Sequence, residues 1–130
     1  MWPSYRKASN ITGVDVTPDV LKTILANNDT VVVKFYAPWC GHCKTFDPIY
    51  KVASSMNANK KIYFTSIDAD KYKGKLQEYN INGYPTVKVF RCINNENKVF
   101  EYNGPRDSRT LVDFCNDVSK RSIIYFYETN

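Results

Sequence analysis

Two cysteines three residues apart, Cys40 and Cys43, are the residues of this chain best suited to chemistry. At the start of a helix this spacing places two thiols on one face about 5–6 Å apart, close to the separation that a disulfide requires. The pair can therefore form and break a disulfide with little backbone movement. Because the helix dipole stabilises a thiolate in the first turn, we expect Cys40 to attack a substrate disulfide and Cys43, one turn deeper, to resolve the mixed disulfide.

The residues between the cysteines are Gly41 and His42, which is the only histidine in the chain. A protonated imidazole beside Cys40 favours its thiolate over the disulfide and makes the oxidised form a stronger oxidant. The alternative is a solvated loop residue without a role. We favour the catalytic role, because a lone histidine between two cysteines has few other ways to act.

Metal binding is the competing interpretation of two cysteines at this spacing. A structural zinc site needs four ligands, and the remaining candidates are Cys92, Cys115 and the one histidine, none of which forms a second pair. We therefore expect no metal. Cys92 and Cys115 are best explained as small core residues, and a bridge between them is the less favoured alternative.

The cysteine pair is predicted to follow a buried strand directly. The strand is the continuous β-branched and aromatic run 31–36, and an apolar helical pattern then extends from Cys40 to about Met56, with a kink expected at Pro48. An earlier helix begins after Thr17 and ends near Asn27. The motif thus lies at the carboxyl end of a strand.

The rest of the chain continues this alternation of strands and helices. The patterns predict a strand over residues 62–67 and a short helix over 71–79. They then predict a hairpin of two strands, 86–90 and 99–102, joined by a polar turn at 94–97, and a last amphipathic helix over 107–121. This order indicates an α/β fold with a mixed central β-sheet and helices on both faces. Ligands of such sheets gather at the carboxyl ends of the strands, where Cys40 lies.

Length and composition favour one globular domain over residues 1–121, followed by an apolar extension, 122–130, that either packs on this domain or begins a contact with another. The 130 residues carry a net charge of +5, but the lysines are scattered, which favours a solvated basic face over a nucleic-acid site. No apolar run approaches the roughly 20 residues that span a bilayer, and neither end shows a signal peptide or a retention tetrapeptide.

Three segments resemble the catalytic domain of protein disulfide isomerases: Phe35-Tyr36-Ala37-Pro38-Trp39-Cys40-Gly41-His42-Cys43-Lys44, Gly83-Tyr84-Pro85-Thr86 and Tyr102-Asn103-Gly104-Pro105-Arg106. They occur in the same order over about residues 11–121. The resemblance implies a thioredoxin fold and no dissociable cofactor. It also implies that Trp39, Tyr84 and Pro85 contact substrate and that the Tyr84-Pro85 bond is cis, so that the Tyr84 backbone can pair with an extended peptide. Arg106 would approach Cys43 transiently and lower its pKa; the alternative is an exposed residue at a helix start.

One position departs from the family pattern. Relatives carry a buried carboxylate six residues before the first cysteine, but this chain has Lys34, and Ser66 replaces the usual lysine partner on the neighbouring strand. A buried neutral lysine could act as a base, and a charged one would stabilise the Cys43 thiolate. The alternative is that Lys34 extends past the edge of the sheet into solvent.

The resemblance predicts an enzyme that forms, reduces and rearranges disulfides in client proteins. Its partners would be client thiols and disulfides, with glutathione or an upstream thiol oxidase, in the lumen of the endoplasmic reticulum. Two other functions remain open from the sequence. One is a peptide-binding chaperone module with weak redox activity, and the other is a thioredoxin-like reductant, against which His42 argues.

Overall fold

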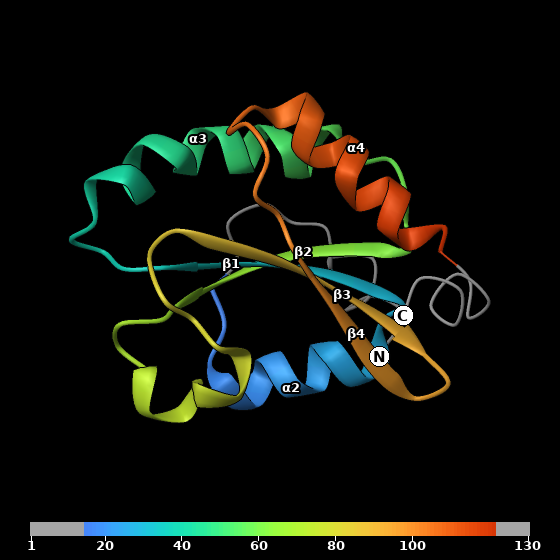
Figure 1. Ribbon diagram of the computed structural model, residues 1–130, viewed down its shortest axis with the longest axis horizontal. Helices are drawn as coiled ribbons and strands as arrows, with labels where there is room; N and C mark the ends of the chain where they lie inside the picture. The colour runs from blue at the N-terminus through green and yellow to red at the C-terminus, as the bar shows by residue number, and fades with distance from the viewer. Residues whose placement is uncertain (1–14, 122–130) are drawn as a thin grey trace.

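The computed structural model describes residues 15–121 and consists of a four-stranded sheet covered by helices on both faces (Figure 1). The strand order is β2-β1-β3-β4; β1 runs parallel to β2 and antiparallel to β3, which is antiparallel to β4. This confirms the mixed sheet of the predicted thioredoxin fold. The elements are α2 (Pro18–Asn27), β1 (Thr30–Tyr36), α3 (Gly41–Met56), β2 (Ile62–Asp68), the 3₁₀ turns η2 (Lys73–Lys75) and η3 (Gln77–Tyr79), β3 (Thr86–Ile93), β4 (Glu96–Glu101) and α4 (Ser108–Ser119).

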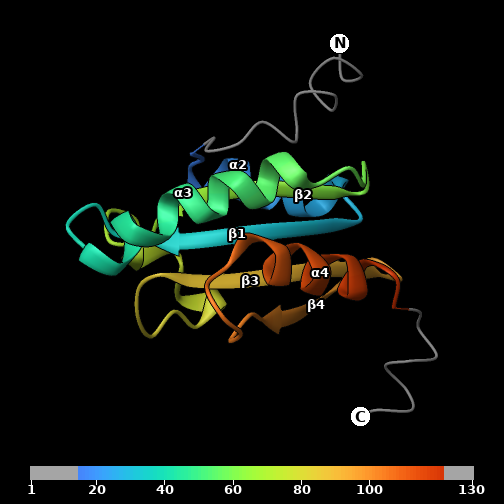
Figure 2. The ribbon, with the colours of Figure 1, turned by 90° about the horizontal axis from the view of Figure 1, so that it is seen from above.

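Alternation along β1 divides the core into two layers. Val31, Val33 and Phe35 pack towards α2, whereas Val32 packs towards α3 and α4. Figures 1 and 2 show α2 on one side of the sheet and α3 and α4 together on the other. The period of two therefore sends Lys34 to the same face as Val32, beneath α3.

Helix α3 is fixed to the sheet by a buried tyrosine. The Tyr50 hydroxyl lies 3.1 Å from the Val32 carbonyl on β1 and 2.7 Å from the Thr65 carbonyl on β2. Tyr50 is 1% exposed, and its ring packs between Phe46 and Phe64. This anchor holds the helix that carries both cysteines over the two central strands.

Two predictions about local structure were wrong. The segment 71–79 forms two 3₁₀ turns instead of one helix, and Asn80 follows with a φ of 54°. In the hairpin, β3 and β4 extend further than predicted and the turn is confined to Asn94 and Asn95, whose φ angles are 54° and 63°. Asparagine accepts left-handed φ better than most residues, which permits this tight turn.

The remaining elements agree with the sequence to within a few residues. Thr17 caps α2 by accepting a hydrogen bond from the Val20 N–H at 3.3 Å, and Asp107 caps α4. Helix α3 continues past Pro48 to Met56. Within residues 15–121, no helix is long and apolar enough to cross a membrane. The predicted apolar extension 122–130 lies outside the described residues.

Candidate active site

The first cysteine occupies the N-cap of α3, directly after the loop that follows β1. The Cys40 sulfur accepts a hydrogen bond from the Cys43 N–H at 3.2 Å, and the Lys44 N–H donates to the Cys40 carbonyl. Buried strand β1 thus delivers Cys40 to a helix N-terminus, as the sequence predicted. The side chain is only 7% exposed, yet it lies at the surface between Trp39 and Tyr84.

The surroundings of Cys40 favour its thiolate. A hydrogen bond from the Cys43 thiol is the largest influence that lowers the pKa of Cys40; burial works against it. The backbone N–H groups of Cys43 and His42 and the positive charge of Arg106 lower this pKa further. The two N–H groups belong to the first turn of α3, and together these groups favour the thiolate of Cys40, which is the nucleophilic form of a cysteine.

Cys43 has the opposite properties. It is 4% exposed, and burial together with its hydrogen bond to Cys40 raises the pKa of Cys43 to about 11. A backbone hydrogen bond from Ala37 and the charge of Lys34 counteract part of this rise. The two thiols therefore have pKa values displaced in opposite directions, which suits one attacking and one resolving thiol.

A cis peptide bond between Tyr84 and Pro85 faces the cysteines, as predicted. The Cys40 sulfur lies 3.6 Å from the Tyr84 carbonyl oxygen. The Trp39 ring meets the Tyr84 ring edge to face at 5.8 Å, and the Trp39 indole N–H donates to Asp70 at 3.1 Å. Trp39 is nevertheless 65% exposed, so a fixed aromatic surface adjoins the reactive sulfur.

The other residues of the predicted site lie around this thiol. Gly41 and His42 are exposed in the first turn of α3, and a Cβ added at Gly41 would meet nothing within 4 Å. Arg106 is exposed as well; its guanidinium carbon lies 6.0 Å from the Phe46 ring centroid. Its charge acts on Cys40, and its approach to Cys43 stays a prediction.

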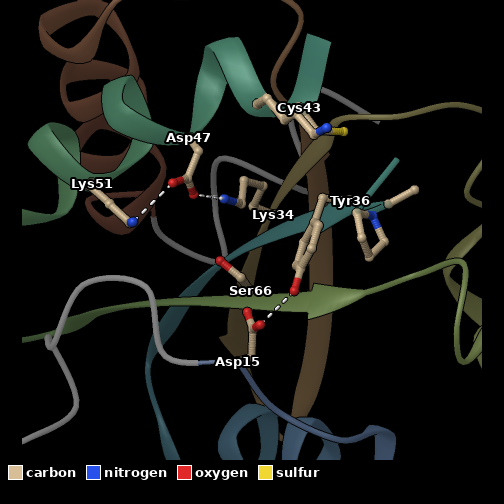
Figure 3. Close-up of a pocket in the computed structure, with 10 residues that line it drawn as sticks. Asp15, Lys34, Tyr36, Cys43, Asp47, Lys51 and Ser66 are labelled. Carbon is tan, nitrogen blue, oxygen red and sulfur yellow. Dashed lines mark hydrogen bonds and ion pairs between the residues drawn. The ribbon is translucent and has the colours of Figure 1, made fainter. Parts of the chain in front are cut away.

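The interpretation in which Lys34 extends past the sheet edge is wrong. Strand β1 lies between β2 and β3, and Lys34 is 4% exposed. Its Nζ forms an ion pair with Asp47 Oδ1 at 2.7 Å, and the other oxygen of Asp47 binds Lys51 at 2.9 Å (Figure 3). The ammonium also lies 5.2 Å from the Tyr36 ring centroid and 5.1 Å from that of Tyr50.

Asp47 is the member of the site that the sequence analysis missed. It follows Cys43 by four residues, so both lie on one face of α3, and it accepts hydrogen bonds from a buried lysine. The available signal was the buried Lys34 itself, since a buried cation requires a partner within reach. In this chain the lysine stands on the central strand, and its acidic partner lies on helix α3 and not at the Ser66 position of the neighbouring strand.

The other two cysteines are free and unpaired with each other. Cys115 is fully buried in the layer beneath α3 and α4, and burial raises its pKa to about 12. Cys92 is half-buried on β3. Among the described residues, no group of three or more histidine, cysteine, aspartate or glutamate side chains is arranged to hold a metal ion.

Comparison with known proteins agrees with this geometry. The thioredoxin family model matches residues 13–117, which include the whole sheet, the cysteine pair and the cis-proline. The chain belongs to the thioredoxin family. Among solved structures, the crystal structure of the Trx4 domain of ERdj5 superposes with a TM-score of 0.76 at 27% identity and covers 84% of this chain and 96% of that domain.

Several relatives that match this chain in sequence carry the name protein disulfide-isomerase. A probable protein disulfide-isomerase A6 from Medicago sativa is 39% identical over 111 residues, which are 84% of this chain but 30% of the relative. A probable protein disulfide-isomerase A4 from Caenorhabditis elegans is 38% identical over 109 residues, covering 82% of this chain and 17% of the relative. The chain therefore corresponds to one domain of considerably longer proteins.

Proposed function

We propose that this chain is a thiol-disulfide oxidoreductase that forms, reduces and rearranges disulfides in client proteins. The observation that carries the proposal is the pair of thiols at the start of α3, one with a lowered and one with a raised pKa, facing the cis bond before Pro85. The similarity to named protein disulfide-isomerases supports the same reaction class.

The reaction begins at Cys40. In reduction, its thiolate attacks a client disulfide, a bond forms between Cys40 and one client sulfur, and the other client sulfur leaves as a thiolate. Cys43 then loses its proton and attacks Cys40, which forms the Cys40–Cys43 disulfide and expels the second client thiolate. Oxidation of a client is the reverse. The backbone N–H of His42 and the positive charge of Arg106 favour the Cys40 thiolate.

Client binding is assigned to the surface around Trp39. Its exposed ring, held by Asp70 and Tyr84, offers an apolar contact beside the sulfur. The Tyr84 backbone is placed to pair with an extended client segment next to Cys40. Tyr84 and Pro85 would thus align the client disulfide with the attacking thiol.

The proposal is tested by separating the two cysteines. We expect Cys43→Ser to accumulate a mixed disulfide with a scrambled, disulfide-bonded client, seen on non-reducing gels, and Cys40→Ser to form none. Insulin reduction and refolding of scrambled ribonuclease should both be lost in Cys40→Ser. If Cys40→Ser assists refolding as well as the unaltered chain does, the chain is a peptide-binding chaperone module instead.

The redox poise distinguishes an isomerase from a thioredoxin-like reductant. We expect the Cys40–Cys43 couple, equilibrated in glutathione buffers, to have a reduction potential near about −180 mV, the value of protein disulfide isomerase, and not near about −270 mV, the value of thioredoxin. His42→Pro should shift the potential towards the reducing value, because proline lacks the backbone N–H that favours the Cys40 thiolate at this position.

The remaining assignments follow from the same reaction. We propose that the endoplasmic reticulum lumen is the compartment and that glutathione or a thiol oxidase regenerates the site, since disulfide formation requires an oxidising environment. Subcellular fractionation of the endogenous protein tests the first assignment. Trapping Cys43→Ser on partners in intact cells tests the second.

A further inference from the structure

The pocket behind Cys43 contains a buried charge pair that no step of the reaction above has used. The pocket has a volume of about 370 Å³. Besides Cys43, its titratable lining groups are Asp15, Lys34, Tyr36, Lys44, Asp47 and Lys51 (Figure 3). Any charge that acts on Cys43 from behind must come from this set.

We propose that Asp47 is a positioning residue for the resolving step: its carboxylate holds the Lys34 ammonium, charged, in the pocket so that Cys43 forms its thiolate beside a fixed cation. This inference deepens the proposed function and rests on it. Cys43 gives its proton to solvent through the pocket, the thiolate attacks Cys40, and the client sulfur leaves and takes up a proton from solvent.

Three contacts place the cation. The Lys34 Nζ lies 2.7 Å from Asp47 Oδ1, and the rings of Tyr36 and Tyr50 flank the ammonium. Lys51 binds the second oxygen of Asp47 at 2.9 Å and so keeps the carboxylate turned towards β1. Because Asp47 lies one turn after Cys43 on the same face of α3, the pair lines the same pocket as the resolving thiol.

Burial explains why the carboxylate is needed. Lys34 is 4% exposed, and a buried ammonium without an anionic partner loses its proton or leaves its site. Asp47 is 38% exposed at its side chain, so it can pair with Lys34 while remaining hydrated. Although burial raises the pKa of Asp47, the ion pairs with Lys34 and Lys51 outweigh it and keep the carboxyl ionised.

Ser66 supports a hydrated pocket. Lys34 and Ser66 are directly paired in the register of β1 and β2, and the buried Ser66 hydroxyl finds no hydrogen-bond partner within residues 15–121. A buried hydroxyl that lines a polar cavity is ordinarily satisfied by water.

The test measures the pKa of Cys43 directly. The variant used carries Cys40→Ala, Cys92→Ser and Cys115→Ala, so that Cys43 is its only cysteine. The pH dependence of its alkylation by iodoacetamide then gives the pKa of Cys43, with no disulfide exchange to interfere. We expect Lys34→Met to raise the Cys43 pKa by about one unit, which corresponds to about a tenfold slower resolution of the mixed disulfide at neutral pH. Lys44→Met, at an exposed lysine of the same pocket, is the matched control and should shift the pKa much less.

The role of Asp47 is tested by a double-mutant cycle. Asp47→Asn should raise the Cys43 pKa, as Lys34→Met does, and Asp47→Glu should leave this pKa close to its value in the unaltered chain. The double variant Lys34→Met with Asp47→Asn should raise the Cys43 pKa no more than Lys34→Met alone. The double variant Lys34→Met with Asp47→Asn has no buried charge, so the Cys43 pKa can still be measured in it if Asp47→Asn alone fails to fold.

Two results would overturn the proposal. An unchanged Cys43 pKa in Lys34→Met shows that the cation does not act on the thiol. The second result is that Asp47→Asn, added to Lys34→Met, slows resolution of the mixed disulfide further without changing the Cys43 pKa. That result shows that Asp47 accepts the proton of Cys43 itself. Loss of exchange with these pKa shifts intact would refute the proposed function but not the charge pair.

Discussion

Tyr50 links the cysteine helix α3 to strands β1 and β2. Its hydroxyl bonds to carbonyls of two different strands from a fully buried position. We expect Tyr50→Phe to lower the free energy of unfolding by about 1–3 kcal/mol, because the buried hydrogen bond from the hydroxyl to the strand carbonyls is lost. Urea denaturation followed by circular dichroism measures the change.

A second tyrosine provides the control. Tyr79 is 8% exposed in the opposite layer, and its hydroxyl has no hydrogen-bond partner among the described residues. Tyr79→Phe should therefore change the free energy of unfolding by less than about 0.5 kcal/mol. Equal losses in the two variants would show that the hydroxyl of Tyr50 is not what fixes α3 to the sheet.

Predictability at the residue scale depended on whether the signal was local. Cys40, Cys43 and Pro85 stand in contiguous motifs, so the sequence identified them and the structure brings them together. Asp47 escaped because its partner, Lys34, is thirteen positions away on another element, and helical spacing alone does not reveal which acid a buried lysine will meet. The burial of Lys34 needed the strand order, which places β1 in the interior of the sheet.

The N-cap residue of α4 is Asp107. Asp107 accepts hydrogen bonds from the N–H and the hydroxyl of Thr110, at 2.9 Å and 2.7 Å, and these bonds lower the pKa of Asp107 below 3.8. A carboxyl whose pKa is lower when folded stabilises above its unfolded pKa, and that contribution is lost as the pH falls through the folded value.

We therefore expect the stability difference between the unaltered chain and Asp107→Asn to be constant from about pH 7 to about pH 5 and to shrink below about pH 4. Urea denaturation at a series of pH values measures it. Thr110→Val, which removes the hydroxyl donor, should reproduce part of the same pH dependence. A difference that stays constant down to about pH 2 contradicts the assigned cap.

Elements with a regular period were predicted well, and those set by single backbone angles were not. Strand β1 and helix α3 follow from their apolar patterns. The segment 71–79 looked helical from composition, but the chain turns twice there and ends on a left-handed Asn80. The predicted hairpin turn was too long, because the tight turn depends on positive φ angles at both Asn94 and Asn95, and the neighbouring residues do not indicate these angles.

At the scale of the whole molecule, the two thiols couple folding to redox state. The lowered pKa of Cys40 stabilises the reduced protein fully above about pH 9, and this contribution is lost as the pH falls through the folded value. The pKa of Cys43, raised to about 11, has the opposite effect: its contribution is present below about pH 9 and is lost as the pH rises to about 11.

The stability of the reduced relative to the oxidised protein should therefore be greatest near about pH 9 and decline on both sides. Urea unfolding of both forms at about pH 6, 7.5, 9 and 10.5 measures this difference. The variant with both cysteines replaced by serine gives the background dependence to be subtracted. A monotonic trend after subtraction would contradict the opposed pKa values of the two thiols.

The two edges of the sheet are poorly suited to accept a strand from another chain. On one side, β4 carries Glu96, Lys98 and Glu101, and on the other, Asp15 already forms a bridge with Ser66 of β2. Charged or occupied edges discourage the addition of a foreign strand. Under the proposed function, the surface beside Tyr84 and Cys40 is then the place for a client segment to bind, because the two edges of the sheet disfavour the addition of a strand.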